Sequence, residues 1–156
     1  MDSRGQPLIV VGVDGSAASK EALRWAAREA GLTGAGLRVV TAWRLPVTYG
    51  YAPDYSGIGY QDRARETLDG VVGEVLGPAP RLTVDARVVE GHPAPVLLAA
   101  AREADLLVVG SHGHGAFAGM LLGSTAQHCT QHAPCPVVVV PSGTVRRSRG
   151  TTGRPA

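Results

Sequence analysis

Hydrophobic and polar positions along the chain follow two alternating patterns. Apolar runs rich in β-branched residues, typical of strands buried on both faces of a sheet, lie at 8–13, 37–43, 106–109 and 136–141. A fifth run, 82–89, alternates apolar and polar residues, which indicates a half-exposed edge strand. Between these runs, apolar residues recur at the three-to-four spacing of amphipathic helices, over about 17–30, 62–76, 93–104 and 124–132.

This alternation predicts an α/β fold: a single open five-stranded parallel sheet with helices on both faces and right-handed crossovers. With the strand order 3-2-1-4-5, the order reverses between the first and fourth strands. Ligands of such sheets bind at that point, beyond the carboxyl ends of the strands. Asp14 follows the first strand and Gly110 ends the fourth, so we expect both at one crevice.

The connection after the fourth strand carries three glycines, Gly110, Gly113 and Gly123, followed by Ser124 and Thr125. Glycine lets the backbone come close to a ligand, because no Cβ stands in the way. Serine and threonine are good N-caps, so a helix is expected to begin there with its free N–H groups facing the loop. Strand, glycine loop and helix N-terminus together make a site for phosphate oxygens. The alternative is a glycine-rich connection that binds nothing.

Composition and charge narrow the classes of function. A chain of 156 residues is long enough for one domain, expected over 1–141, and a disordered basic tail is expected over 142–156. The net charge is +2, but the tail holds four arginines and no acid, so the rest of the chain is near −2. That distribution does not favour nucleic-acid binding. The chain has no apolar run of about 18 residues, so no membrane span is expected.

Two further features bear on location and on ligand access. The N-terminus is typical of a first strand and not of a signal peptide, and the spacing of the two cysteines fits neither a metal site nor a disulfide framework. A reducing cytoplasm is therefore expected. The long segment 46–61 holds all four tyrosines. We interpret it as a mobile connector or as a flap near the ligand with a tyrosine able to stack on a base.

Three stretches, VGVDGSAASKEALRWAA, DLLVVGSHGHG and PCPVVVVP, resemble the universal stress protein family over nearly the whole chain, 8–141. The family's ATP-binding signature, G-x2-G-x9-G-S/T, matches Gly110, Gly113, Gly123 and Ser124 without a gap. The resemblance implies a Rossmann-like fold of the adenine nucleotide alpha hydrolase-like type. It also implies membership of the ATP-binding subgroup and a role in the stress response.

The resemblance also implies a role for each part of the site. The triphosphate would lie along 113–125, the ribose near Asp14 and Gly110, and the adenine by the end of the first strand and Ala42. A carboxylate suits ribose hydroxyls, and backbone N–H groups suit phosphate oxygens. His112 and His114 would bring a pH-dependent charge to the phosphates. The expected binding residues are Gly12, Val13, Asp14, Ala42, Gly110, Ser111, His112, Gly113, Gly123, Ser124 and Thr125.

Catalysis has less support than binding. The chain has no G-x4-G-K-S/T motif and no lysine near the loop, so it is not a P-loop NTPase. Asp14, the one acid that we place in the crevice, is expected to bind the ribose, so no residue is assigned to activate a water molecule. We therefore expect an ATP-binding signalling module with little or no hydrolysis, and Mg2+ can enter with the nucleotide. The alternatives are a slow ATPase and a protein-interaction domain whose loop is empty.

Two remaining patterns concern metals and partners. His128 and His132 lie four residues apart with Cys129 between them, but a third metal ligand is unassigned, so roles on the helix surface are favoured. The run Val137–Val140 would make an unprotected edge strand, which pairing with the same strand of a second molecule would cover. The family's dimers resemble this arrangement. A homodimer and an unknown protein partner are therefore expected.

Overall fold

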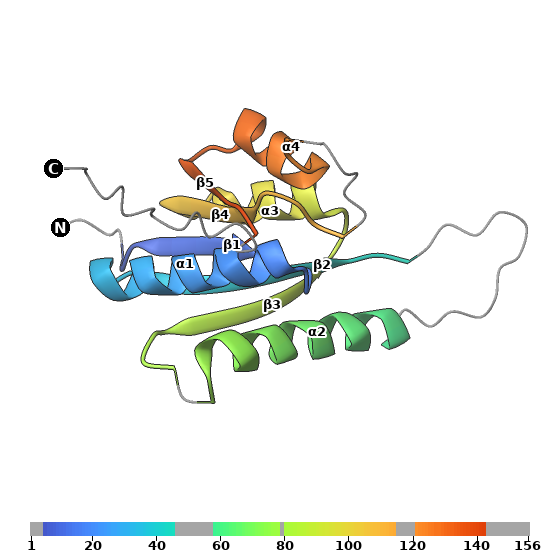
Figure 1. Ribbon diagram of the computed structural model, residues 1–156, viewed down its shortest axis with the longest axis horizontal. Helices are drawn as coiled ribbons and strands as arrows, with labels where there is room; N and C mark the ends of the chain where they lie inside the picture. Colours follow the sequence, from blue (N-terminus) through green and yellow to red (C-terminus); the bar gives the residue numbers. More distant parts are fainter. Residues whose placement is uncertain (1–4, 46–57, 79, 115–120, 143–156) are drawn as a thin grey trace, which may run out of the picture.

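A computed structural model describes residues 5–45, 58–78, 80–114 and 121–142, and its sheet has the predicted topology (Figure 1). Five parallel strands lie in the order β3-β2-β1-β4-β5. The strands are β1 (Leu8–Gly12), β2 (Gly36–Trp43), β3 (Val84–Glu90), β4 (Leu106–Gly110) and β5 (Val137–Val140). The helices are α1 (Ala17–Thr33), α2 (Ile58–Leu76), α3 (Pro93–Ala101) and α4 (Ser124–His132).

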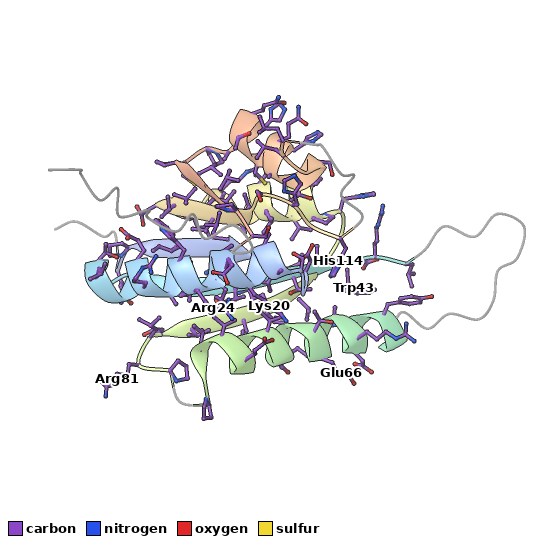
Figure 2. The ribbon with its side chains drawn as sticks, in the orientation of Figure 1. Lys20, Arg24, Trp43, Glu66, Arg81 and His114 are labelled. Carbon is purple, nitrogen blue, oxygen red and sulfur yellow. The ribbon has the colours of Figure 1, made fainter. Side chains whose placement is uncertain are left out.

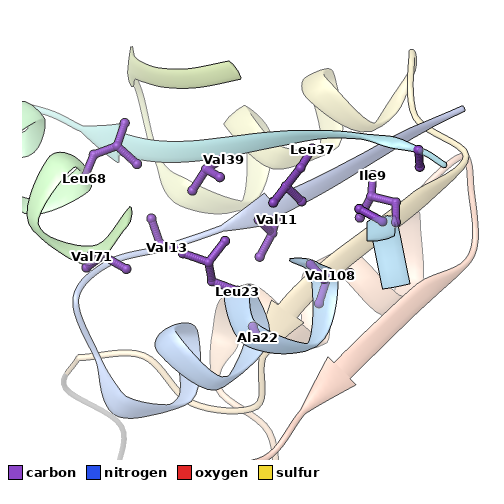
Figure 3. Close-up of a cluster of buried hydrophobic side chains, with 13 residues drawn as sticks. Ile9, Val11, Val13, Ala22, Leu23, Leu37, Val39, Leu68, Val71 and Val108 are labelled. Atoms are coloured by element: carbon purple, nitrogen blue, oxygen red, sulfur yellow. The ribbon is translucent and has the colours of Figure 1, made fainter. Parts of the chain in front are cut away.

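Helices cover both faces of the sheet: α1 and α2 pack on one face, α3 and α4 on the other (Figure 1). The first two are joined by an ion pair in which Lys20 Nζ lies 2.9 Å from Glu74 Oε2, and Figure 2 shows Lys20 between them. Successive strand residues point to opposite faces. Val11 therefore packs under α1 and α2 (Figure 3), whereas the adjacent Val10 packs under α3 and α4.

Helix α1 begins and ends as its sequence predicts. Ser16 Oγ accepts a hydrogen bond from the Ser19 N–H at 3.3 Å, and Ser19 Oγ donates to the Ser16 carbonyl at 2.9 Å. These two bonds satisfy groups that a helix leaves free at its N-terminus. The helix ends at Gly34, whose φ of 73° is the left-handed conformation that glycine adopts without strain. The sequence pattern places the end of this helix near residue 30, but the helix continues to Thr33 and includes Gly31.

Other boundaries also differ from the expected ones: α3 ends at Ala101 and not near 104, and β3 begins at Val84 and not at 82. Helix α2 begins at Ile58 and not at about Asp62, so the end of the tyrosine-rich segment is helical. Helix α4 begins at Ser124 as predicted, but its N-cap is Gly123 and no side chain caps it. The expected flap lies mostly outside the described residues, because 46–57 is not among them, and so does the expected tail beyond Ser142.

The two sheet edges differ in chemistry. On β5, four valines are half-buried and carry no charge. On β3, Arg65 of α2 reaches the edge and its Nη1 donates to the Ala86 carbonyl at 3.1 Å. The Leu37 N–H donates to the Thr83 carbonyl, so odd-numbered residues of β3 face β2 and the Ala86 carbonyl points away from the sheet. An arginine thus occupies a backbone acceptor that a further strand would need.

Among the described residues, no helix combines the length and the apolar character that crossing a membrane requires.

Candidate functional site

A cleft of about 770 Å³ lies at the carboxyl ends of β1 and β4, where the strand order reverses. Figure 2 shows His114 and Trp43 at this end of the sheet and Arg81 at the other. All eleven residues that we expected to bind the ligand line the cleft: Gly12, Val13, Asp14, Ala42, Gly110, Ser111, His112, Gly113, Gly123, Ser124 and Thr125. Segments more than 100 residues apart in sequence therefore meet in one cavity, as the topology predicts.

Asp14 is the one acid among the described residues that line the cleft. Its Oδ1 accepts a hydrogen bond from the Ser16 N–H at 2.9 Å. Burial raises the pKa of the Asp14 carboxyl, but hydrogen bonds from Ser16, Ser19 and His114 outweigh burial, so this pKa lies below its ordinary value of 3.8. The side chain is thus an anion at neutral pH, and it is held in one orientation.

His114 connects the loop after β4 to the loop after β1. Its N–H donates to Asp14 Oδ2 at 3.3 Å, and its Nε2 lies 2.7 Å from the Asp14 carbonyl oxygen. A carbonyl can only accept, so the proton is on Nε2. The expectation that His114 lies beside the phosphates stays a prediction; in the structure its imidazole contacts the backbone carbonyl of Asp14.

The motif glycines are required by contacts within the protein. A Cβ on Gly110 would lie 2.8 Å from the backbone carbon of Ala18 in α1, and a Cβ on Gly113 would lie 2.6 Å from Asp14 Oδ2. Real Cβ atoms do not approach other atoms so closely. We expected both glycines to make room for a ligand. Gly110 makes room for helix α1, and Gly113 lets its loop lie against the acid.

The N-terminus of α4 forms one wall of the cleft. The Gly123 N–H donates to the Ser111 carbonyl at 2.7 Å, which brings the start of the helix against the loop after β4. The first hydrogen bond inside the helix joins the Gln127 N–H to the Gly123 carbonyl at 2.9 Å. The N–H groups of Ser124, Thr125 and Ala126 therefore have no partner inside the helix and are available to an anion. The side chains of Ser111 and His112 also belong to this wall, and Ser111 Oγ lies 3.0 Å from His112 Nδ1.

The opposite wall is apolar. Val40 and Ala42 of β2 line it together with Leu97 of α3. A Cβ on Gly12 would lie 2.6 Å from Leu97 Cδ1, so glycine at this position lets Leu97 pack against the end of β1. Beneath this wall the Thr41 hydroxyl donates to the Val13 carbonyl at 2.9 Å, which ties the ends of β1 and β2 together. A flat apolar group such as a nucleobase fits a wall of this kind.

Besides Ser16 and Ser19 at the start of α1, three polar residues of the cleft were not expected to line it: Arg44, His92 and His128. Arg44 follows β2, His92 precedes α3, and Arg44 Nη1 lies 2.7 Å from His92 Nδ1. Their positions at the carboxyl ends of β2 and β3 could have indicated them, because those ends face the same edge of the sheet. With His112 and His114, four of the five histidines in the chain line the cleft.

Metal-binding groups are sparse in the part of the chain that the structure describes: no cluster of three or more His, Cys, Asp or Glu residues could hold an ion. The rings of His128 and His132 lie 5.9 Å apart, centroid to centroid. Cys129 between them is fully buried, and burial raises the pKa of its thiol to about 11. A thiol of this kind is not an available ligand.

The order of the five strands, the helices on both faces and a cleft at the switch point define the class of this protein, a Rossmann-like parallel α/β fold. The chain belongs to the universal stress protein family, whose model matches residues 8–141. A universal stress protein of Mycobacterium tuberculosis (strain H37Rv) is 34% identical over 148 residues, which cover 89% of this chain and 49% of that protein. The chain thus spans about half the length of the curated relatives it matches.

Solved structures agree with this assignment. The crystal structure of a universal stress protein in complex with cAMP matches with a TM-score of 0.68 and 27% identity, covering 87% of this chain and 97% of that one. A universal stress protein from Archaeoglobus fulgidus in complex with dAMP matches with a TM-score of 0.59 and 25% identity, covering 87% and 98%. Both share the fold described above.

Proposed function

We propose that the cleft binds ATP and that the chain acts as a nucleotide-binding signalling module of the stress response. The observation that carries the proposal is the meeting of an anion-binding helix N-terminus, a fixed carboxylate and an apolar wall in one cleft. Its volume of about 770 Å³ is within the ordinary range of small-molecule sites, about 300–1,000 Å³. The two solved relatives that hold cAMP and dAMP support an adenine nucleotide as the ligand.

Each part of ATP has a chemically matched partner in this proposal. The phosphates lie at the N-terminus of α4, near His112 and the hydroxyls of Ser124 and Thr125. The ribose hydroxyls donate to Asp14, and the adenine lies against Ala42. Mg2+ enters with the nucleotide, held mainly by phosphate oxygens and water, because it needs few protein ligands.

Slow or absent hydrolysis follows from the same residues. Asp14 already accepts hydrogen bonds from two N–H groups, and its pKa lies below the ordinary value, so it is a weak base. No lysine lines the cleft among the described residues, and the one arginine, Arg44, contacts His92. A fast ATPase needs a positioned base and a fixed cation beside the γ-phosphate. A slow ATPase remains the second candidate, and a protein-interaction domain that binds no nucleotide is the third.

Calorimetric titration with ATP tests the proposal, and Gly113→Ala and Asp14→Ala serve as site variants. We expect saturable binding by the wild type and weaker binding by both variants. Absence of saturable binding in the wild type would contradict the proposal and favour the interaction domain. Mass spectrometry of the small molecules released from the denatured protein would then identify what the cleft had retained.

Labelled ATP separates the module from an enzyme. We expect turnover well below roughly 1 s⁻¹, the low end of ordinary enzymes. Turnover above that rate, abolished in Asp14→Ala, would favour the ATPase.

The chain spans about half the length of its curated relatives. The partner that reads the bound state is proposed as an unidentified protein. A cytoplasmic location stays a prediction that rests on the N-terminal sequence and on the spacing of the two cysteines.

We also propose that two chains pair through β5. The Ser111 N–H donates to the Val140 carbonyl, so even-numbered residues of β5 face β4. Val137 and Val139 therefore direct their N–H and carbonyl groups away from the sheet. A second β5 related by two-fold symmetry would satisfy those groups and cover the half-buried valines.

A further inference from the structure

Asp14 and His114 make two contacts across the mouth of the cleft. The peptide N–H of His114 donates to one carboxylate oxygen, at 3.3 Å, and the imidazole Nε2–H donates to the carbonyl of the same aspartate, at 2.7 Å. The first bond acts on the carboxylate and the second on the backbone that carries it. Together with the Ser16 N–H, which donates to the other carboxylate oxygen at 2.9 Å, they fix the direction in which Asp14 projects into the cleft.

Two glycines allow this pair of contacts. Gly113 lies against the carboxylate, where a Cβ would be 2.6 Å from Oδ2. Gly15 has a φ of 85°, and a Cβ there would lie 3.6 Å from His114 Nε2. The positive φ turns the chain directly after Asp14. The loops after β1 and β4 are thus built to bring one imidazole against one aspartate.

The carboxylate that results has unused acceptor capacity. Ionised carboxylates offer about four lone-pair positions. The N–H groups of Ser16 and His114 use one on each oxygen, at 2.9 and 3.3 Å, and the side chains of Ser16 and Ser19 also lower the pKa of this carboxyl. Because Asp14 lines the cleft, the remaining lone pairs are available to two adjacent hydroxyl groups, such as the 2′ and 3′ hydroxyls of a ribose. A deoxygenated sugar would leave this anion without those partners, which is costly at a desolvated site.

We propose that His114 is a positioning residue that makes the cleft selective for ribonucleotides, by holding Asp14 toward the sugar. This inference rests on the proposed nucleotide-binding function and goes beyond it, since it names the selectivity of the site and the residue that sets it. His114 acts through Asp14 and does not contact the phosphates. Its removal therefore affects affinity for the sugar hydroxyls and leaves affinity for the phosphates and the base unchanged.

The test compares ATP with 2′,3′-dideoxy-ATP in calorimetric titrations of the full chain. We expect the wild type to bind ATP more tightly than the dideoxy analogue. We expect His114→Ala to weaken ATP binding about 3- to 10-fold, the range for one lost hydrogen bond, and to leave binding of the analogue unchanged within about twofold. His114→Gln, whose amide N–H can reach the same carbonyl, should restore much of the preference for ATP. His132→Ala, on an exposed histidine that does not line the cleft, is the matched control.

Each outcome has a distinct meaning. An equal loss for both ligands in His114→Ala would overturn the proposal, because it would show a phosphate contact or a general loss of structure. A wild type that binds both ligands equally would overturn it without any variant, while leaving nucleotide binding intact. A wild type that binds neither ligand would instead reject the proposed function on which the inference rests. Should His114→Ala fail to fold, His114→Phe, which keeps a ring of similar size and removes the hydrogen-bond donor, takes its place with the same expected result.

Discussion

At the scale of single residues, a glycine in the signature is required where another part of the protein occupies the space of its side chain. Gly110 lies against α1, where a Cβ would be 2.8 Å from a backbone carbon. The motif could be found in the sequence, but this reason could not, because α1 lies some 90 residues away from Gly110. Sequence spacing shows which positions are glycine and does not show what approaches them.

Gly110→Ala should lower the free energy of unfolding by about 1–3 kcal/mol, because the helix must shift to admit a methyl group. Gly70→Ala is the matched control: it lies in α2 with open space around it, and should raise stability by about 1 kcal/mol. Urea denaturation measures both. Equal effects of the two substitutions would show that packing against α1 is not the reason for glycine at position 110.

Asp14 should make stability depend on pH in acid. Its pKa in the folded chain is below the ordinary 3.8, so its ionised form stabilises the fold above about pH 3.8 and this contribution is lost as pH falls through the folded pKa. Asp14→Asn should therefore cost about 1 kcal/mol near neutral pH and progressively less in stronger acid. Denaturation at stepped pH measures this, with exposed Glu66→Gln as the control. A cost that stays constant with pH would contradict the assignment.

The sequence identified the residues at the ends of β1 and β4 better than those at the ends of β2 and β3. Asp14 and Gly113 belong to local turn patterns that can be recognised without the fold. Arg44 and His92 belong to no motif, and they face each other only because β2 and β3 are neighbours in the sheet. Contacts of this kind depend on the tertiary structure, so a reading of local pattern does not find them.

At the scale of elements, each helix is stabilised by the apolar side chains that it buries against the sheet. Leu23 of α1 is fully buried in the core under α1 and α2 (Figure 3). Leu32 of the same helix is 77% exposed. Leu23→Ala should lower the free energy of unfolding by about 2–5 kcal/mol. Leu32→Ala should change it by less than about 0.5 kcal/mol. Chemical denaturation compares the two, and similar losses would mean that the helix is not oriented as described.

Element type was predictable from periodicity, whereas element ends were not always. Apolar runs identified four strands of the sheet and alternation identified β3, and the apolar spacing over about 17–30 located most of α1. Helix α2 begins earlier than expected because Ile58 and Gly59 carry no strong start signal. The start of α4 was predicted from two good capping residues, yet the cap is Gly123, which the contact with Ser111 holds in place.

At the scale of the whole molecule, the strand order decides where the site is. The order 3-2-1-4-5 was proposed as the arrangement that brings the ends of β1 and β4 together, and the structure has this order. Parallel pairing and right-handed crossovers leave few alternatives for a chain that alternates strand and helix. Assembly of two chains is not determined by these rules and stays a proposal.

Val139→Pro should break a dimer formed through β5 without disturbing the pairing of β5 with β4. Residue 139 directs its N–H away from β4, so proline removes a donor that a second chain would use. Val139→Ala is the control, since it shortens the side chain and keeps the N–H. In sedimentation at micromolar concentration, the wild type and Val139→Ala should be dimers and Val139→Pro a monomer. A monomeric wild type would reject the β5 interface.

Arg65 of α2, which contacts the outer strand β3, has a consequence for how many sheets can be joined. Two sheets aligned along β5 would form one ten-stranded sheet bounded on each side by β3. At each boundary, Arg65 already fills the Ala86 acceptor. If two chains pair through β5 as proposed, Arg65 at each outer edge would oppose the pairing of a further strand with β3, so that the assembly would end at two chains.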